Sequence, residues 1–271
     1  MLQSLGAHTF GFVWRQDVGA AVEDLAAAGF TKFQLFAMSP HLDAWAPSVD
    51  SLERVGRTVR QCSGEILAVD LPSSDINLAS PSKDATDFAV TTYLKVLDLA
   101  ERVGARWLTL NSGRRHALLP PPDNRLLTVY RASLERLVRA AEGKGLRILI
   151  ENIPGMLLSD AESLAHFLEE QDYGLVDVLY DVSNAWAIGE NPVQGLRRLH
   201  SRVAVVHLSD AKCGTWKHDP IGAGDIDFAA IREVLISESY KGDIVLEVLS
   251  DDPLRDMVRS RTLLAQIDGR R

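Results

Sequence analysis

Short apolar runs alternate along the chain with longer segments in which apolar residues recur at helical spacing. The runs are typical of buried parallel strands and the longer segments of amphipathic helices. The predicted strands are His8 to Phe12, Thr31 to Phe36, Glu65 to Asp70, Arg106 to Leu110, Leu146 to Glu151, Val176 to Asp181, Val203 to His207 and Asp243 to Glu247. The predicted helices are Val18 to Ala28, Val49 to Cys62, Asp84 to Val103, Leu126 to Lys144, Ser159 to Glu170, Pro192 to Leu199, Phe228 to Ser237 and Leu254 to Gln266.

This alternation runs from end to end without a composition break that would mark a linker, which predicts one α/β domain over residues 1–271. The length of 271 residues is close to the roughly 250 of a (β/α)₈ TIM barrel. A doubly wound open sheet is the alternative, because alternating strands and helices do not by themselves distinguish the two. Polar residues at the ends of four successive strands favour the barrel, whose mouth gathers all strand ends.

Four potential metal ligands, Glu151, Asp181, His207 and Glu247, each close one of the last four apolar runs. In a barrel, the three carboxylates and one imidazole would meet in one small volume, where unpaired carboxylates would repel each other. A divalent cation is the simplest way to hold them together. Oxygen ligands with one nitrogen suit Mn²⁺, Mg²⁺, Co²⁺ or Zn²⁺, and we expect a single such ion, with Mn²⁺ favoured.

Taken one at a time, these residues have simpler interpretations. A glutamate at a strand end can reach solvent, an aspartate there often caps a helix or turn, and a lone histidine in a strand is usually a core residue with its hydrogen bonds satisfied. Coincidence at four successive strand ends is a poor explanation, so we interpret the four as one site.

Composition narrows the class of protein. The chain is 46% hydrophobic and carries a formal charge of −8, which gives nucleic-acid backbones little general attraction. Only Cys62 and Cys213 are present, and their spacing suggests neither a disulfide framework nor a zinc ribbon. We find no signal-peptide pattern and no apolar run long enough to span a membrane, so we expect a cytoplasmic enzyme with no membrane and no nucleic-acid partner.

The motifs around the four residues resemble those of the xylose-isomerase-like superfamily of TIM barrels. That superfamily includes sugar and sugar-phosphate isomerases and epimerases, inosose dehydratases and apurinic endonucleases. The resemblance spans essentially the whole chain and specifies the superfamily better than the substrate. It is carried by Ile150-Glu151-Asn152, Tyr180-Asp181, His207-Leu208-Ser209-Asp210, the loop from His218 to Phe228, and Leu246-Glu247.

The resemblance implies that all four matched residues bind one divalent ion and that Glu151 and Glu247 also act as an acid and base pair. It implies an isomerase or epimerase that moves a proton through a metal-stabilised enediolate of a sugar or related polyhydroxylated carbonyl compound. A dehydratase or lyase of an inosose-like substrate starts with the same proton abstraction and is the nearest alternative. A binding barrel without turnover is a further one.

Departures from the superfamily pattern argue against a nuclease. Apurinic endonucleases need additional ligands for three zinc ions, and this chain has Asp70-Leu71, Asn111, Asn184 and Trp216 where those ligands would stand. The same Asn184 replaces a histidine with which many sugar epimerases contact a substrate oxygen. Asn184 therefore indicates a substrate or a reaction different from that of typical ketose epimerases, because asparagine carries no charge near neutral pH.

The remaining candidates are predicted substrate contacts at the barrel mouth. Aromatic rings suit the apolar face of a sugar, and the loop around position 217 is where relatives place a basic contact. Each has a simpler interpretation as a core or solvated loop residue, and the oligomeric state, including a homo-oligomer, is left open. The predicted contacts are His8, Trp14, Asn111, Asn184, Trp186, Lys217 and His218. A basic group over residues 114–116 could meet an anionic substrate.

Overall fold

The computed structural model describes residues 5–72, 75–116, 118–171 and 173–269. Its eight strands are all parallel to their neighbours and form a closed ring in chain order. The ring closes where the first strand pairs with the last, with Gly6 opposite Val245. The strands are β1 (Leu5–His8), β2 (Lys32–Phe36), β3 (Glu65–Asp70), β4 (Trp107–Leu110), β5 (Arg147–Glu151), β6 (Val176–Asp181), β7 (Val203–Leu208) and β8 (Asp243–Leu246).

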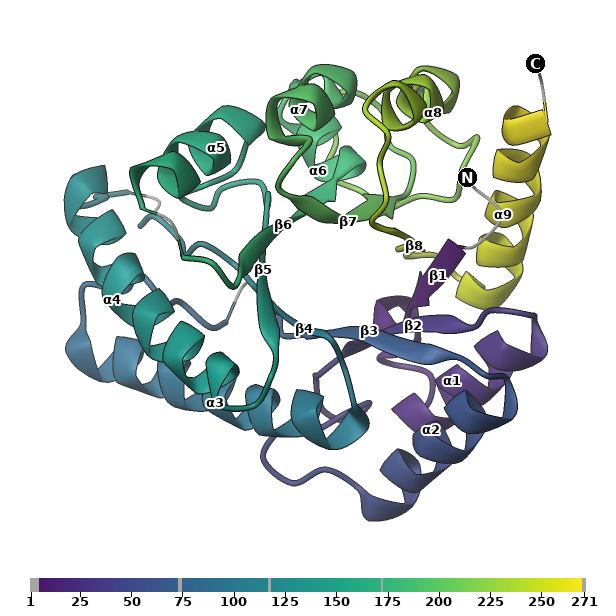
Figure 1. Cartoon of the computed structure of the whole chain (residues 1–271), viewed down its shortest axis with the longest axis horizontal. Coiled ribbons are helices and arrows are strands. Elements are labelled where there is room, and N and C mark those ends of the chain that lie inside the picture. The colour runs from purple at the N-terminus through teal and green to yellow at the C-terminus, as the bar shows by residue number, and fades with distance from the viewer. Residues whose placement is uncertain (1–4, 73–74, 117, 172, 270–271) are drawn as a thin grey trace.

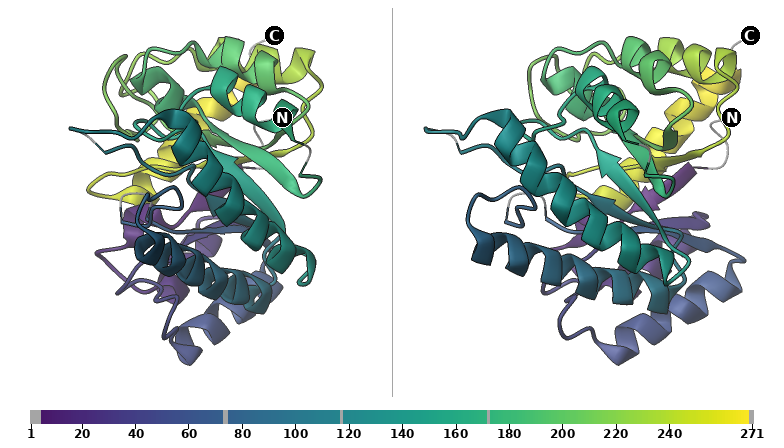
Figure 2. Two further views of the ribbon diagram at one scale, coloured as in Figure 1. Left: turned by 90° about the vertical axis from the view of Figure 1, so that its left-hand side faces the viewer. Right: turned by 60° about the vertical axis from the view of Figure 1, so that its left-hand side comes forward.

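Helices surround this ring, as the view down the barrel shows (Figure 1), and they lie along the outside of the strands in the side views (Figure 2). The fold is therefore a (β/α)₈ TIM barrel, as predicted, and not a doubly wound open sheet. No helix in the described part of the chain is both long enough and apolar enough to cross a lipid bilayer. The helices are α1 (Val18–Ala27), α2 (Val49–Gln61), α3 (Lys83–Val103), α4 (Asp123–Glu142), α5 (Ala161–Glu170), α6 (Val182–Ala187), α7 (Pro192–Leu199), α8 (Phe228–Ser237) and α9 (Pro253–Gly269).

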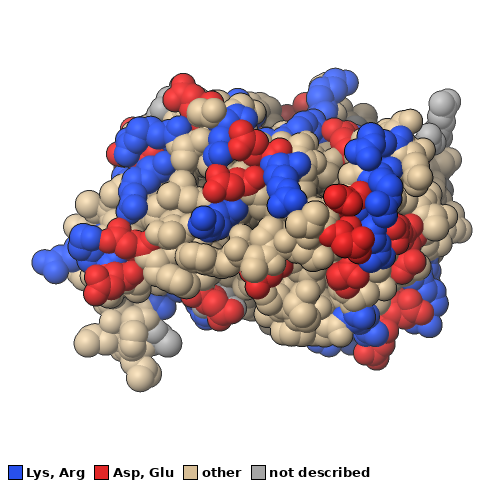
Figure 3. Space-filling view, turned by 90° about the horizontal axis from the view of Figure 1, so that it is seen from below, with Lys and Arg blue, Asp and Glu red and all other residues tan. Residues whose placement is uncertain are grey.

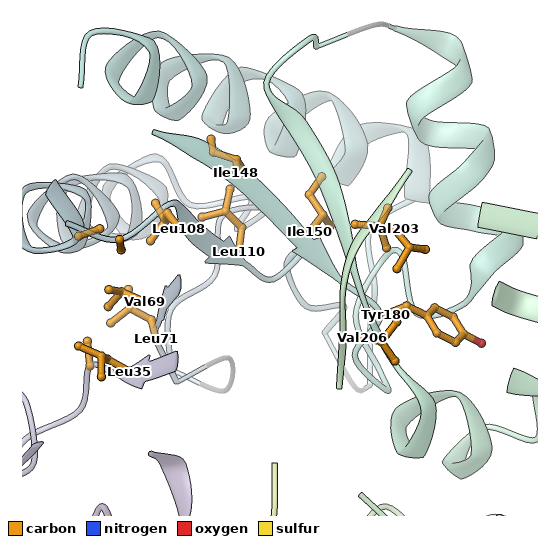
Figure 4. Close-up of a cluster of buried hydrophobic side chains, with 14 of the residues drawn as sticks. Leu35, Val69, Leu71, Leu108, Leu110, Ile148, Ile150, Tyr180, Val203 and Val206 are labelled. Atoms are coloured by element: carbon orange, nitrogen blue, oxygen red, sulfur yellow. The ribbon is translucent and has the colours of Figure 1, made fainter. Parts of the chain in front are cut away.

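Alternation along the strands sorts their side chains into two apolar layers, because successive residues point to opposite faces. On β5, Ile148 and Ile150 point outward and join the large core between strands and helices, part of which Figure 4 shows. Leu149 points inward and belongs to a smaller cluster inside the barrel. The smaller cluster consists of Leu67, Ala68, Trp107, Leu149, Leu179, Val205 and Val245. The consecutive pair Leu67 and Ala68 departs from strict alternation where the register between β2 and β3 shifts.

The first predicted strand was placed too late in the sequence. β1 is Leu5–His8, whereas the predicted strand ran from His8 to Phe12. Residues Phe10–Phe12 form a 3₁₀ turn instead. The turn brings the chain so close to the end of β8 that a Cβ on Gly11 would lie 2.6 Å from the carbonyl oxygen of Val248. An apolar run was thus mistaken for a strand where aromatic residues turn into the barrel mouth.

Four helix starts also differ from the prediction: α3 begins at Lys83 rather than Asp84, α4 at Asp123 rather than Leu126, α5 at Ala161 rather than Ser159, and α9 at Pro253 rather than Leu254. Asp160, and not Ser159, caps α5 by accepting from the backbone N–H of Ser163 at 2.8 Å. Asp160 and Ser163 form a capping box at this helix start, because the side chain of each accepts from the backbone N–H of the other. Helix α6 was not predicted, because it follows β6 with no intervening residue and Asp181 both ends the strand and caps the helix.

Candidate metal centre and active-site cavity

The four predicted ligands come together at the C-terminal end of the barrel. Each follows by two positions an inward-pointing apolar residue of β5 to β8, so it faces the barrel interior one layer above the apolar cluster. One potential ligand atom from each of the four lies within 4.8 Å of those of the others. The four are Glu151, Asp181, His207 and Glu247.

The ring of His207 is held in one orientation. Its Nδ1 lies 2.9 Å from Oε2 of Glu247 and 3.7 Å from Oδ2 of Asp181. Its Nε2 lies 2.8 Å from Oε1 of Gln34. The side-chain amide of Gln34 donates to Asp70 at 2.9 and 3.0 Å, which leaves only its oxygen for His207. His207 Nε2 is therefore the donor to Gln34, and Nδ1 faces the carboxylates.

These residues fit a divalent cation. Asp181 is 0% exposed, and its Oδ2 has no hydrogen-bond partner among the described residues. A buried, unpartnered carboxylate oxygen is costly unless a cation or a donor meets it. Three carboxylate groups and an imidazole nitrogen, with the second ring nitrogen tied to an outer partner, form a suitable donor set for such an ion.

The two glutamates differ in their protonation. Burial raises the pKa of Glu151 well above its usual range, and the charge of Glu247 raises it further. Burial alone would also raise the pKa of Glu247, but His218, His8 and His207 outweigh this effect and lower it. For His207, burial opposes protonation, yet its interactions with the neighbouring carboxylates raise its pKa well above the usual range. The cluster thus favours positive charge at its centre.

A cavity of about 690 Å³ opens above the cluster, within the size range of small-molecule sites. Glu151 and Glu247 line this cavity, whereas Asp181 and His207 do not and are 0% and 1% exposed. The two glutamates can therefore reach a bound molecule from the floor of the cavity. The other lining residues are Phe10, Trp14, Phe36, Met38, Asp70, Leu71, Pro72, Asp75, Ile153, Asn184, Trp216, Lys217, His218, Asp219 and Leu249.

Four of the predicted substrate contacts lie in this lining: Trp14, Asn184, Lys217 and His218. Trp14 is 75% exposed at the rim. Nδ1 of His218 lies 3.6 Å from the Glu247 carboxylate and 3.0 Å from the hydroxyl of Ser209. His218 therefore borders the cluster as well as the cavity.

The side chain of Asn184 is engaged on both sides. Its Nδ2 donates to Oε1 of Glu151 at 3.1 Å, and its Oδ1 accepts from the indole Nε1–H of Trp216 at 2.7 Å. Its backbone N–H donates to Oδ1 of Asp181 at 2.7 Å. Asn184 thus connects two residues of the cluster to the cavity wall.

Two other predicted contacts, His8 and Asn111, are buried and bonded to other protein groups. His8 is 1% exposed, and its Nε2 contacts Asp70 while its Nδ1 accepts from the backbone N–H of Phe10 at 3.0 Å. Asn111 is 3% exposed and donates to the hydroxyl of Tyr93 at 2.8 Å. Neither side chain lines the cavity.

The last predicted contact and the basic group also have protein partners. The indole N–H of Trp186 donates to Asp225 in the loop after β7, outside the cavity lining. Arg115 pairs with Asp123 at 2.9 Å and donates to the carbonyl of Met156 at 2.8 Å. Residues 114–116 are not part of the described cavity lining.

Sequence reasoning missed three residues of this site: Gln34, Asp70 and Trp216. Asp70 closes the apolar run of β3 as the four predicted ligands close theirs, so the same rule could have selected it. Gln34 was also detectable from sequence, because it is a polar residue inside the apolar run of β2. In the structure its side chain is 0% exposed. Trp216 stood out only as a departure from the nuclease ligand pattern, and its contact with Asn184 depends on the path of a loop.

Comparisons with known proteins agree with this architecture. The sequence model of the family described as xylose isomerase-like TIM barrel matches residues 22–267. An uncharacterized protein of Methanocaldococcus jannaschii is 26% identical over 206 residues, which cover 74% of this chain and 69% of that protein. An inosose dehydratase of Clostridium botulinum is 25% identical over 154 residues, and the match spans about half of each chain, 49% and 52%.

Among solved structures, a D-tagatose 3-epimerase-like protein superposes with a TM-score of 0.85 at 22% identity, covering 97% of this chain and 96% of the other. At that identity the likeness concerns the fold alone.

Proposed function

Because the chain belongs to the xylose isomerase-like TIM-barrel family, we propose that it is a divalent-metal-dependent isomerase or epimerase of a sugar or related polyhydroxylated carbonyl compound. The observation that carries this proposal is the division of labour within the cluster. Glu151 and Glu247 face the cavity, whereas Asp181 and His207 lie beneath it and can only hold an ion. Two of the four residues are thus available for acid–base chemistry.

The ion would be held by Glu151, Asp181, His207 and Glu247. When bound, it would supply positive charge that stabilises negative charge developing on substrate oxygens. Mn²⁺ is our preferred ion, and Mg²⁺, Co²⁺ and Zn²⁺ suit the same donors.

The two glutamates divide the proton transfers. Both carboxylates reach the cavity, so one of them can act as the base that removes a proton from the carbon beside the carbonyl group and the other as the acid that returns a proton. Return to the opposite face of the same carbon gives an epimer, and return to the adjacent carbon gives an isomer.

A metal-dependent dehydratase of an inosose-like compound is the second candidate. Its support is the sequence match to inosose dehydratases, which covers about half of this chain. The first step, abstraction of a proton beside a carbonyl group, would use the same base. The two reactions differ in whether a neighbouring hydroxyl group then leaves as water.

A nucleic-acid substrate has little support. Within the described residues, one group of at least three histidine, cysteine or carboxylate ligands is found, which suits a single ion better than a three-metal cluster. The face in Figure 3 has Lys and Arg interspersed with Asp and Glu and no basic stripe among its described residues. We therefore propose a small-molecule substrate.

The proposal is tested by loading the full chain with Mn²⁺ and measuring metal content and deuterium wash-in from D₂O. The panel consists of ketoses, sugar phosphates, inososes and hydroxypyruvate. We expect one equivalent of metal and exchange into at least one substrate, with loss of water identifying a dehydratase. Glu247→Gln should abolish exchange, whereas Glu233→Gln on the exposed surface of α8 should not. No exchange across the panel, or exchange retained in Glu247→Gln, would overturn the proposal.

A further inference from the structure

We propose that Asn184 is a positioning residue for Glu151, and that Trp216 fixes the orientation of the Asn184 side-chain amide. The chain of contacts is short. The indole N–H of Trp216 donates to Oδ1 of Asn184 at 2.7 Å, and Nδ2 of Asn184 donates to Oε1 of Glu151 at 3.1 Å. The kinetic part of this inference rests on the proposed function.

Hydrogen-bond chemistry allows only one orientation of the amide. An indole N–H can only donate, so it requires the oxygen of Asn184 on its side. A carboxylate can only accept, so Glu151 requires the nitrogen. Reversal of the amide would break both hydrogen bonds and bring its oxygen against the carboxylate. Trp216 therefore acts on Glu151 through Asn184, which is 2% exposed and shielded from water that could replace either bond.

The main chain of Asn184 is fixed as well. Its N–H donates to Oδ1 of Asp181 at 2.7 Å at the start of α6, the helix that Asp181 caps. Asp181 thus holds the backbone of Asn184, and the side chain of Asn184 holds Glu151.

The loop after β7 is braced so that the indole has a defined place. The carboxylate of Asp210 accepts from the backbone N–H groups of Gly222 at 2.8 Å and Ala211 at 2.9 Å. Gly224 packs so closely against this point that a Cβ there would lie 2.2 Å from the carbonyl oxygen of Ala211. The indole of Trp186 also donates to Asp225. These contacts fix both ends of the segment that carries Trp216.

The positioning matters because Glu151 lies at the floor of the cavity among other carboxylates. A neutral amide orients one carboxyl oxygen without adding charge, and it leaves the second oxygen for an ion or a substrate. Trp216 is 53% exposed and lines the cavity, so it lies between a bound molecule and the hydrogen bonds that connect Trp216, Asn184 and Glu151. Loss of these hydrogen bonds should therefore disturb the chemical step more than substrate binding.

The contact itself can be tested without turnover. In ¹⁵N-labelled full-length protein, Trp216→Phe identifies the indole N–H resonance of Trp216 by its disappearance. In Asn184→Ala that resonance should move upfield, because a hydrogen-bonded indole proton becomes solvated. Trp45→Phe identifies a matched control indole that is 52% exposed, and its resonance should stay in place in Asn184→Ala. An unmoved Trp216 resonance in Asn184→Ala would overturn the inference.

The kinetic test uses a double-mutant cycle on the active substrate. Trp216→Phe keeps a ring in the cavity wall and should lower kcat about fivefold with KM nearly unchanged, the effect of one lost neutral hydrogen bond. Asn184→Ala should lower kcat at least as much, and the double variant should equal Asn184→Ala alone. Multiplicative losses would show that Trp216 acts independently and would overturn the inference. If even the wild-type chain turns over nothing, the proposed function fails, and the resonance test alone decides the inference.

Discussion

Nε2 of His207 lies 2.8 Å from the side-chain oxygen of Gln34, a residue 173 positions earlier in the chain. This contact crosses the barrel interior from β7 to β2. It fixes which nitrogen of His207 carries hydrogen toward Gln34 and turns the other nitrogen toward the carboxylates. The orientation of a proposed metal ligand is thus set by a residue that lies three strands away around the barrel.

Replacement of Gln34 should weaken metal binding. Gln34→Leu removes the acceptor for His207 Nε2–H and leaves Asp70 without the amide donor it has at 2.9 Å. Outer partners of metal-ligating histidines typically contribute 10- to 100-fold in affinity, so we expect a rise in the Kd for Mn²⁺ of about that size. Calorimetric titration of the metal-free protein measures it. Gln61→Leu on the exposed surface of α2 is the control, and equal affinities in both variants would contradict the assignment.

An uncharged substrate should be preferred over its phosphate ester. Even without Glu151 and Glu247, whose charge a bound ion would offset, carboxylates outnumber the single lysine, Lys217, in the described lining of the cavity. Like charges brought together at a binding site cost several kcal/mol, so kcat/KM should be at least about tenfold higher for a free sugar than for the same sugar phosphorylated. The comparison uses paired substrates from the deuterium wash-in panel. If the phosphate ester is the better substrate and Lys217→Met removes that advantage, the expectation is wrong. The lining carboxylates are Asp70, Asp75, Glu151, Asp219 and Glu247.

Much of the fold follows from local sequence. The bounds predicted for β3 and β6 coincide with those observed, because each is an apolar run that ends in an aspartate. Helix α7 also has its predicted bounds, with a proline in its first turn. The bounds predicted for the first strand were wrong because an apolar run is equally compatible with a turn that contains aromatic residues. Only the contact of this turn with the end of β8 distinguishes the two.

The candidate site likewise contains residues that the sequence alone can identify and residues that only the folded structure can identify. Position at a strand end is a local property, so the four proposed ligands could be selected from sequence. The partners of those ligands depend on barrel closure and on loop paths, as with Gln34 on β2 and Trp216 in the loop after β7. Sequence rules that treat each residue separately could not show that Asn184 would hydrogen-bond Glu151, or that His8 would contact Asp70.

The N-terminal end of the barrel should be a determinant of stability rather than of activity. Asp243 is 7% exposed and lies 2.5 Å from Nζ of Lys32, and it also contacts Arg106. Asp243→Asn removes the charge and should lower the free energy of unfolding by about 1–3 kcal/mol, with kcat unchanged. Urea denaturation measures this. Asp98→Asn, which removes a pairing partner of Lys144 with 59% exposure, should change it by less than about 0.5 kcal/mol. A loss of activity without loss of stability in Asp243→Asn would contradict this division.

Stability should decrease in mild acid because His41 is buried as the neutral form. Its Nδ1–H donates to the carbonyl of Gln16 at 2.6 Å, and Nε2 lies 3.1 Å from the hydroxyl of Thr9. That hydroxyl accepts from the backbone N–H of Phe36 at 3.0 Å, so its own hydrogen is free to donate to His41.

Burial lowers the pKa of His41 below 6.5, so the unfolded chain binds the proton more readily than the folded one. The contribution of His41 to stability is therefore complete above about pH 6.5 and is lost as the pH falls toward the lower folded pKa. Urea denaturation between pH 8 and pH 5 should show a smaller acid loss in His41→Gln than in wild type. His166→Gln, at a side chain that is 71% exposed, should leave the slope unchanged. An equal or steeper acid loss in His41→Gln would mean that the folded protein accommodates a protonated His41.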